Sequence, residues 1–134
     1  VCAWATGSAM AAQPAPMVLQ QVGPHTFYVQ GLAALGSTDN QNFISNAGFV
    51  VAATGVVVID ALGSPALAKR LIANLKAITS KPITHVIVTH YHADPIYVLQ
   101  AFKDVGAALV GQERATRSIH TTTPRLRSVP PRVT

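Results

Sequence analysis

The stretch VVVIDALGSPALAKRLIANLKAITSKPITHVIV, residues 56–88, joins two apolar runs through one amphipathic segment. Ser64 can cap a helix, Pro65 suits the first helical position, and apolar side chains recur at helical spacing at Leu67, Leu71, Leu75 and Ile78. The second apolar run is short and continuous, which is typical of a strand buried in a parallel sheet. The stretch therefore predicts a strand, a helix and a parallel strand.

The flanking sequence extends this alternation on both sides. Residues 17–23 and 25–31 predict two short strands, and residues 43–59 predict two more that are joined at a Thr-Gly turn. Residues 96–106 have helical spacing and end in glycine, and residues 107–111 predict a further strand. The fold class expected from this order is α/β.

The positive charge is confined to one end of the chain. The formal net charge is +5, but residues 1–113 hold five basic and five acidic side chains, so the excess lies in residues 114–134. We expect this Arg-, Thr- and Pro-rich tail to be disordered and residues 17–113 to form one domain. The tail lacks interleaved aromatic residues, so nucleic acid is not an expected partner.

The first residues of the chain have two interpretations, a clipped export signal or a flexible leader. Residues 1–16 are small, apolar and Pro-rich and contain Ala9-Met10-Ala11, which fits the end of a clipped export signal. That interpretation predicts a periplasmic or secreted protein, whereas a flexible leader leaves a cytoplasmic location open. The apolar run 47–59 is shorter than the ~20 residues that a membrane helix needs, so we expect no membrane association.

The segment THYHADP, residues 89–95, follows directly on the second strand of the central unit. Alternate residues of extended backbone point the same way, so His90 and His92 can lean onto one ion. Asp94 lies roughly 13 Å from His90 along a straight chain, and it needs a bend or a second ion to join them. Imidazole suits zinc, which activates water for attack on a carbonyl group. The pattern therefore predicts a zinc hydrolase.

A structural interpretation accounts for part of the same segment. Asp94 before Pro95 would cap a helix with no metal present, and Asp60 would cap the turn after its strand. This leaves His90 and His92 unexplained. Among the remaining histidines, His85 is expected to be partly buried in its strand.

These residues resemble the metallo-β-lactamase superfamily, whose metal motif reads His-x-His-x-Asp-His in a loop after a strand. The resemblance covers residues 18–111 and implies the αββα sandwich of that family, of which this chain would supply the amino-terminal half. It implies that His90 and His92 bind the first of one or two zinc ions. By the same resemblance Asp94 binds the second ion and acts in catalysis by orienting the attacking water, and Asp60 supports the metal loop from behind.

The chain departs from the family pattern at three points. Pro95 stands where the family has a histidine that binds the second zinc, and Val98 stands where glycine is common. The third departure is that no residue here replaces the ligands that the fold's second half supplies; His120 is the single downstream histidine. These departures give the motif a degenerate character.

Two functions follow as expectations. The first is a zinc-dependent metallo-hydrolase in which metal-bound hydroxide attacks the ester, lactam, lactone or thioester carbonyl of a small molecule. The alternative is a truncated, non-catalytic remnant that binds at most one metal ion weakly. In either case a half sandwich leaves one face of its sheet uncovered, which predicts a homodimer through that face.

Overall fold

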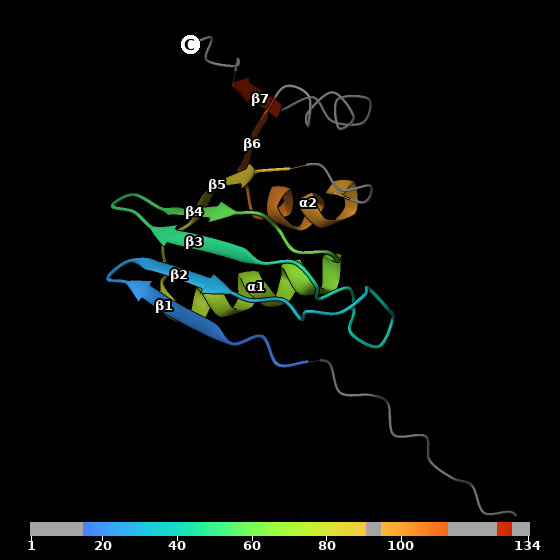
Figure 1. Ribbon diagram of the computed structural model, residues 1–134. Helices are drawn as coiled ribbons and strands as arrows, with labels where there is room; N and C mark the ends of the chain where they lie inside the picture. The colour runs from blue at the N-terminus through green and yellow to red at the C-terminus, as the bar shows by residue number, and fades with distance from the viewer. Residues whose placement is uncertain (1–14, 91–94, 113–125, 130–134) are drawn as a thin grey trace, which may run out of the picture.

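The computed structural model describes residues 15–90, 95–112 and 126–129 and has one mixed sheet with two helices (Figure 1). Seven strands of the described residues lie in the sheet in their order along the chain. Strands β1 to β4 pair antiparallel, and β4 to β7 pair parallel. The elements are β1 Leu19–Gly23, β2 Thr26–Val29, β3 Ala47–Val51, β4 Val56–Ile59, α1 Pro65–Ile78, β5 Ile83–Val88, α2 Pro95–Asp104, β6 Ala108–Gln112 and β7 Leu126–Val129. The α/β class predicted from the sequence is confirmed.

Both helices lie on the same side of the sheet. Helix α1 connects β4 to β5 and α2 connects β5 to β6, and these strands are parallel neighbours. Such crossovers are right-handed, so two of them that advance in the same direction place their helices on one face. The helices also pack against each other (Figure 1).

The core lies between this face and the helices. One row of side chains crosses the sheet in register, from Phe27 through Phe49, Val58 and Val86 to Leu109. The last four are buried, and the rings of Phe27 and Phe49 stack with their centroids 4.9 Å apart. Leucines of α1 and Phe102 of α2 close the core from the other side.

Helix α1 begins as the sequence predicts. The Ser64 hydroxyl accepts a hydrogen bond from the Leu67 amide at 3.3 Å, and Pro65 is the first helical residue. Leu67, Leu71 and Leu75 are buried, whereas Ile78 is 40% exposed. The helical spacing predicted for these four residues is present in α1, and the buried stripe ends before Ile78.

A glycine with left-handed backbone follows the end of helix α2. Gly106 has a φ of 86°. Its amide donates to the carbonyl of Lys103, and the Ala107 amide donates to the carbonyl of Phe102. These two bonds form a Schellman motif, which satisfies carbonyls that the helix leaves unpaired. Gly106 therefore stops the helix as predicted.

Neither helix of the described residues covers the second face of the sheet. Its register rows include Val50, Val57, His85 and Ala108, with Ile59 and Ile87 in the next row. His85 is exposed on this open face, so the expectation of a partly buried residue is wrong. Side chains alternate between faces along a strand, and β5 turns His85 away from the helices.

One segment of the tail that was expected to be disordered forms a strand. Residues 126–129 form β7, which pairs parallel with β6 from Leu109↔Leu126 to Gln112↔Val129. A short tail segment can add to a sheet because the edge strand offers unpaired backbone groups, which composition does not reveal. Residues 1–14, most of the tail, and the predictions made on them lie outside the described residues. No described helix has the length and apolar character to cross a membrane.

Candidate metal centre

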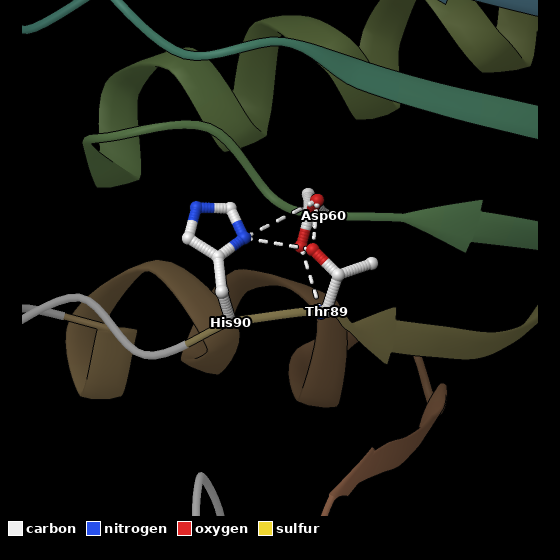
Figure 2. A network of polar contacts seen from close by, with 3 residues as sticks. All are labelled: Asp60, Thr89 and His90. Carbon is white, nitrogen blue, oxygen red and sulfur yellow. Dashed lines mark hydrogen bonds and ion pairs between the residues drawn. The ribbon is translucent and has the colours of Figure 1, made fainter.

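Three polar residues meet where two neighbouring parallel strands end. Asp60 follows β4 directly, and Thr89 and His90 follow β5. Because β4 and β5 are parallel neighbours, their carboxyl ends lie at the same edge of the sheet. Ligands of open α/β sheets bind beyond this edge. Figure 2 shows the three side chains converging there.

Asp60 fastens the end of β4 to the end of β5. Its amide donates to the carbonyl of Ile87 at 2.9 Å. Its Oδ1 accepts from the Thr89 amide at 2.9 Å, and its Oδ2 accepts from the Thr89 hydroxyl at 2.7 Å. The φ of Asp60 is 59°, a left-handed conformation that aspartate tolerates better than most residues. This turn aims the carboxylate at β5.

His90 faces this pair with one ring nitrogen. Its Nδ1 lies 2.7 Å from the Thr89 hydroxyl oxygen and 3.8 Å from Asp60 Oδ2. The other ring nitrogen lies on the opposite edge of the imidazole, away from Asp60 and Thr89 (Figure 2). The His90 side chain is 55% exposed and that of Asp60 is 24% exposed. The ring therefore stands at the surface with the carboxylate behind it.

A cavity of about 60 Å³ opens beside this group. Its walls include Ser45, Asn46, Asp60, Leu62, His90 and Val98. The Ser45 hydroxyl oxygen is buried and has no hydrogen-bond partner among the described residues. Leu62 has a φ of 68°, which a bulky side chain rarely adopts. Unsatisfied polar atoms and unusual backbone conformations both concentrate at functional sites.

The structure places one of the three predicted metal ligands. His90 lies at the carboxyl end of β5 as expected, whereas His92 and Asp94 fall in residues 91–94, outside the described residues. Within residues 15–90, 95–112 and 126–129, no three His, Cys, Asp or Glu side chains come together as a metal site. The convergence of His90 with His92 and Asp94 stays a prediction.

Comparison with known proteins identifies the family. A sequence model of the metallo-beta-lactamase superfamily matches residues 41–131, which include Asp60, Thr89, His90 and the whole of the candidate loop. This chain belongs to the metallo-beta-lactamase superfamily. No curated protein sequence matches it.

Solved structures of the superfamily share its fold. A metallo-beta-lactamase from Hirschia baltica superposes with a TM-score of 0.65 at 19% identity, covering 85% of this chain and 52% of that one. The mono-zinc form of FIM-1 from Pseudomonas aeruginosa gives 0.65 at 16% identity, covering 87% and 51%. A metallo-beta-lactamase from Pontibacter korlensis gives 0.66 at 16% identity, covering 83% and 52%. The chain therefore spans about half the length of these enzymes.

The described residues fit one imidazole ligand of a metal ion. Metal-binding histidines commonly hydrogen-bond through their second ring nitrogen to a carboxylate, a carbonyl or a water, which fixes the ring. The Nδ1 of His90 has such a connection through Thr89 to Asp60. The adjacent cavity exceeds the volume of one water-sized probe, so it leaves room for an ion and a water.

Two residues of this site, Thr89 and Ser45, had no role predicted from the sequence. Thr89 stands in the motif segment, and the signal that could have identified it is a hydroxyl side chain directly before the first histidine. Ser45 lies in a loop before β3, far from the motif in sequence, and no local pattern marks it. Both residues belong to the site because strands distant in sequence end side by side.

Proposed function

We propose that this chain carries the first metal-binding loop of a zinc-dependent hydrolase that acts on the carbonyl group of a small molecule. The substrate classes that this chemistry suits are esters, lactams, lactones and thioesters. The observation that carries the proposal is His90 at the carboxyl end of β5, with its Nδ1 connected to Asp60, in a chain of this superfamily.

The roles of the residues follow from their chemistry. His90 and His92 would hold zinc, and Asp94 would bind a second ion or orient the attacking water. When zinc is bound with an open coordination position, it lowers the pKa of a bound water to about 7. Asp60 and Thr89 would orient His90 from behind. The Ser45 hydroxyl, buried without a described partner, could donate to an oxygen in the cavity.

A second candidate function is a non-catalytic protein that holds one metal ion. Pro95 is the first residue of α2 and supplies no side-chain ligand at the motif position where the superfamily has a histidine. Val98 is 3% exposed and lines the cavity, so its side chain occupies space that a glycine would leave open there. Loss of a ligand lowers the affinity of the second ion and favours this candidate.

The amount of zinc bound per chain tests whether the protein has a metal site. After purification and dialysis against trace zinc, we expect about one bound ion per chain by mass spectrometry of the metal. His90→Ala and His92→Ala should both remove it, because each deletes an imidazole ligand. A wild-type zinc content no higher than that of His90→Ala would reject the metal site.

His85→Ala is the matched control. It removes an imidazole from the same strand, but His85 faces the open side of the sheet, so zinc content should stay at the wild-type level. A panel of a lactam, a lactone and a thioester then separates the two candidates. Hydrolysis that disappears in His90→Ala but not in His85→Ala supports the enzyme, and zinc binding without hydrolysis supports the non-catalytic protein.

A further inference from the structure

We infer that Thr89 is a positioning residue that relays the Asp60 carboxylate to His90 and holds the imidazole with its proton on Nδ1. The lone pair of this tautomer is on Nε2, the nitrogen that would then bind a metal ion. The inference deepens the proposed function and rests on it for the identity of the ion. The arrangement of protons within the three residues stands on hydrogen-bond chemistry alone.

Asp60, as a carboxylate, can only accept hydrogen bonds. Its Oδ2 is 2.7 Å from the Thr89 hydroxyl oxygen, so the single hydroxyl proton must point at Asp60. The opposite assignment would set two acceptor oxygens against each other at that separation. The second carboxylate oxygen, Oδ1, accepts a separate hydrogen bond from the Thr89 amide.

The direction of the hydrogen bond from Thr89 to Asp60 determines the direction of the one between Thr89 and His90. With its proton committed to Asp60, the Thr89 oxygen can interact with His90 only as an acceptor. Nδ1 of His90 is 2.7 Å from that oxygen, so Nδ1 must be the donor and must carry a proton. A neutral imidazole has one N–H, and its other nitrogen then has the lone pair.

The distances also show that Asp60 can hold the proton on Nδ1 of His90 only through the Thr89 hydroxyl. Nδ1 of His90 lies 3.8 Å from Oδ2, which is beyond hydrogen-bond distance. The hydroxyl closes this gap with two bonds of 2.7 Å each. The opposite edge of the ring, which carries Nε2, points away from both residues (Figure 2). Thr89 therefore connects Asp60 to His90 so that Nδ1 carries the proton and Nε2 carries the lone pair.

The test is the tautomer of His90 in metal-free protein, read from ¹⁵N shifts and two-bond ¹H–¹⁵N couplings at about pH 8.5, where imidazole is neutral. The His90 signals are assigned by their loss in His90→Gln. We expect the proton on Nδ1 in the wild type and a shift of the major species to Nε2–H in Thr89→Val. Thr89→Ser retains the hydroxyl and should restore the wild-type tautomer.

Zinc affinity, measured by competition with a chelating dye, gives the second readout. Thr89→Val should bind zinc roughly 10-fold more weakly than the wild type, and Thr89→Ser should bind nearly as well. The Thr89 amide still bonds to Asp60 in both variants, so the loop keeps its backbone anchor. Circular dichroism verifies that both variants fold.

Two results would overturn the inference. One is a wild-type His90 with its proton on Nε2, which needs no variant and so does not depend on folding. The other is a Thr89→Val protein with an unchanged tautomer, as would occur if Asp60 moved to bond His90 directly. A protein with the expected tautomers that binds no zinc rejects the proposed metal site and leaves the Thr89 relay standing, so the two failures are distinguishable.

Discussion

Gly106 illustrates a residue whose backbone conformation, and not its packing, determines its identity. Its φ is 86°, and a β-carbon built there would have no heavy atom within 4 Å. The β-carbon of an alanine at this position would therefore not clash with any neighbouring residue. The left-handed conformation is nonetheless unfavourable for an L-residue with a β-carbon, by roughly 1–2 kcal/mol.

We accordingly predict that Gly106→Ala lowers the free energy of unfolding by about 1 kcal/mol. Gly106→Asn should lower it less, because asparagine tolerates this conformation at helix ends. The measurement is the urea midpoint by circular dichroism, with an unchanged denaturant slope. An alanine variant as stable as the wild type would show that the Schellman turn adapts to a different backbone.

The beginning of α1 is an element-scale feature that sequence alone predicts. Serine before proline predicted both the cap and the first helical residue. In the structure the Leu67 amide donates a hydrogen bond to the Ser64 hydroxyl. We predict that Ser64→Ala lowers the free energy of unfolding by about 1 kcal/mol, because a helix amide loses its acceptor. Ser64→Asp should retain most of the stability, since aspartate is also a good cap.

Ser80→Ala is the control for this substitution. Ser80 is exposed in the turn after α1 and takes part in none of the hydrogen bonds of the described residues. Its replacement should leave the urea midpoint unchanged. Equal effects of Ser64→Ala and Ser80→Ala would contradict a capping role.

Local patterns predicted the elements, and long-range contacts account for what they missed. The helix spacing of α1 and the Gly106 stop depend on neighbours within a few residues, and both were correct. The exposure of His85 depends on which face the helices cover, and β7 depends on an unpaired edge of β6. The Thr89 relay joins residues 60 and 89, and no spacing rule connects them.

At the scale of the whole molecule, the open face of the sheet, which no described helix covers, presents apolar side chains. Its register positions from β2 to β6 alternate with the core positions and carry no Asp, Glu, Lys or Arg. They include Val50, Val57, Ile59, Ile87 and Val110. His85 is the ionisable histidine at these positions, and the apolar side chains around it favour association in water. A second copy would meet no repulsion between like charges on it.

We therefore propose that the 134-residue chain by itself self-associates through this face. Ile87 is 37% exposed there, and Ile87→Lys would place a charge in the interface, so sedimentation should shift from dimer or larger species toward monomer. Ile78→Lys is the matched control, because Ile78 is 40% exposed at the end of α1, away from this face, and should leave the distribution unchanged. A wild-type chain that sediments as a compact monomer at all concentrations would contradict the proposal, because the apolar rows would then be stable in contact with water.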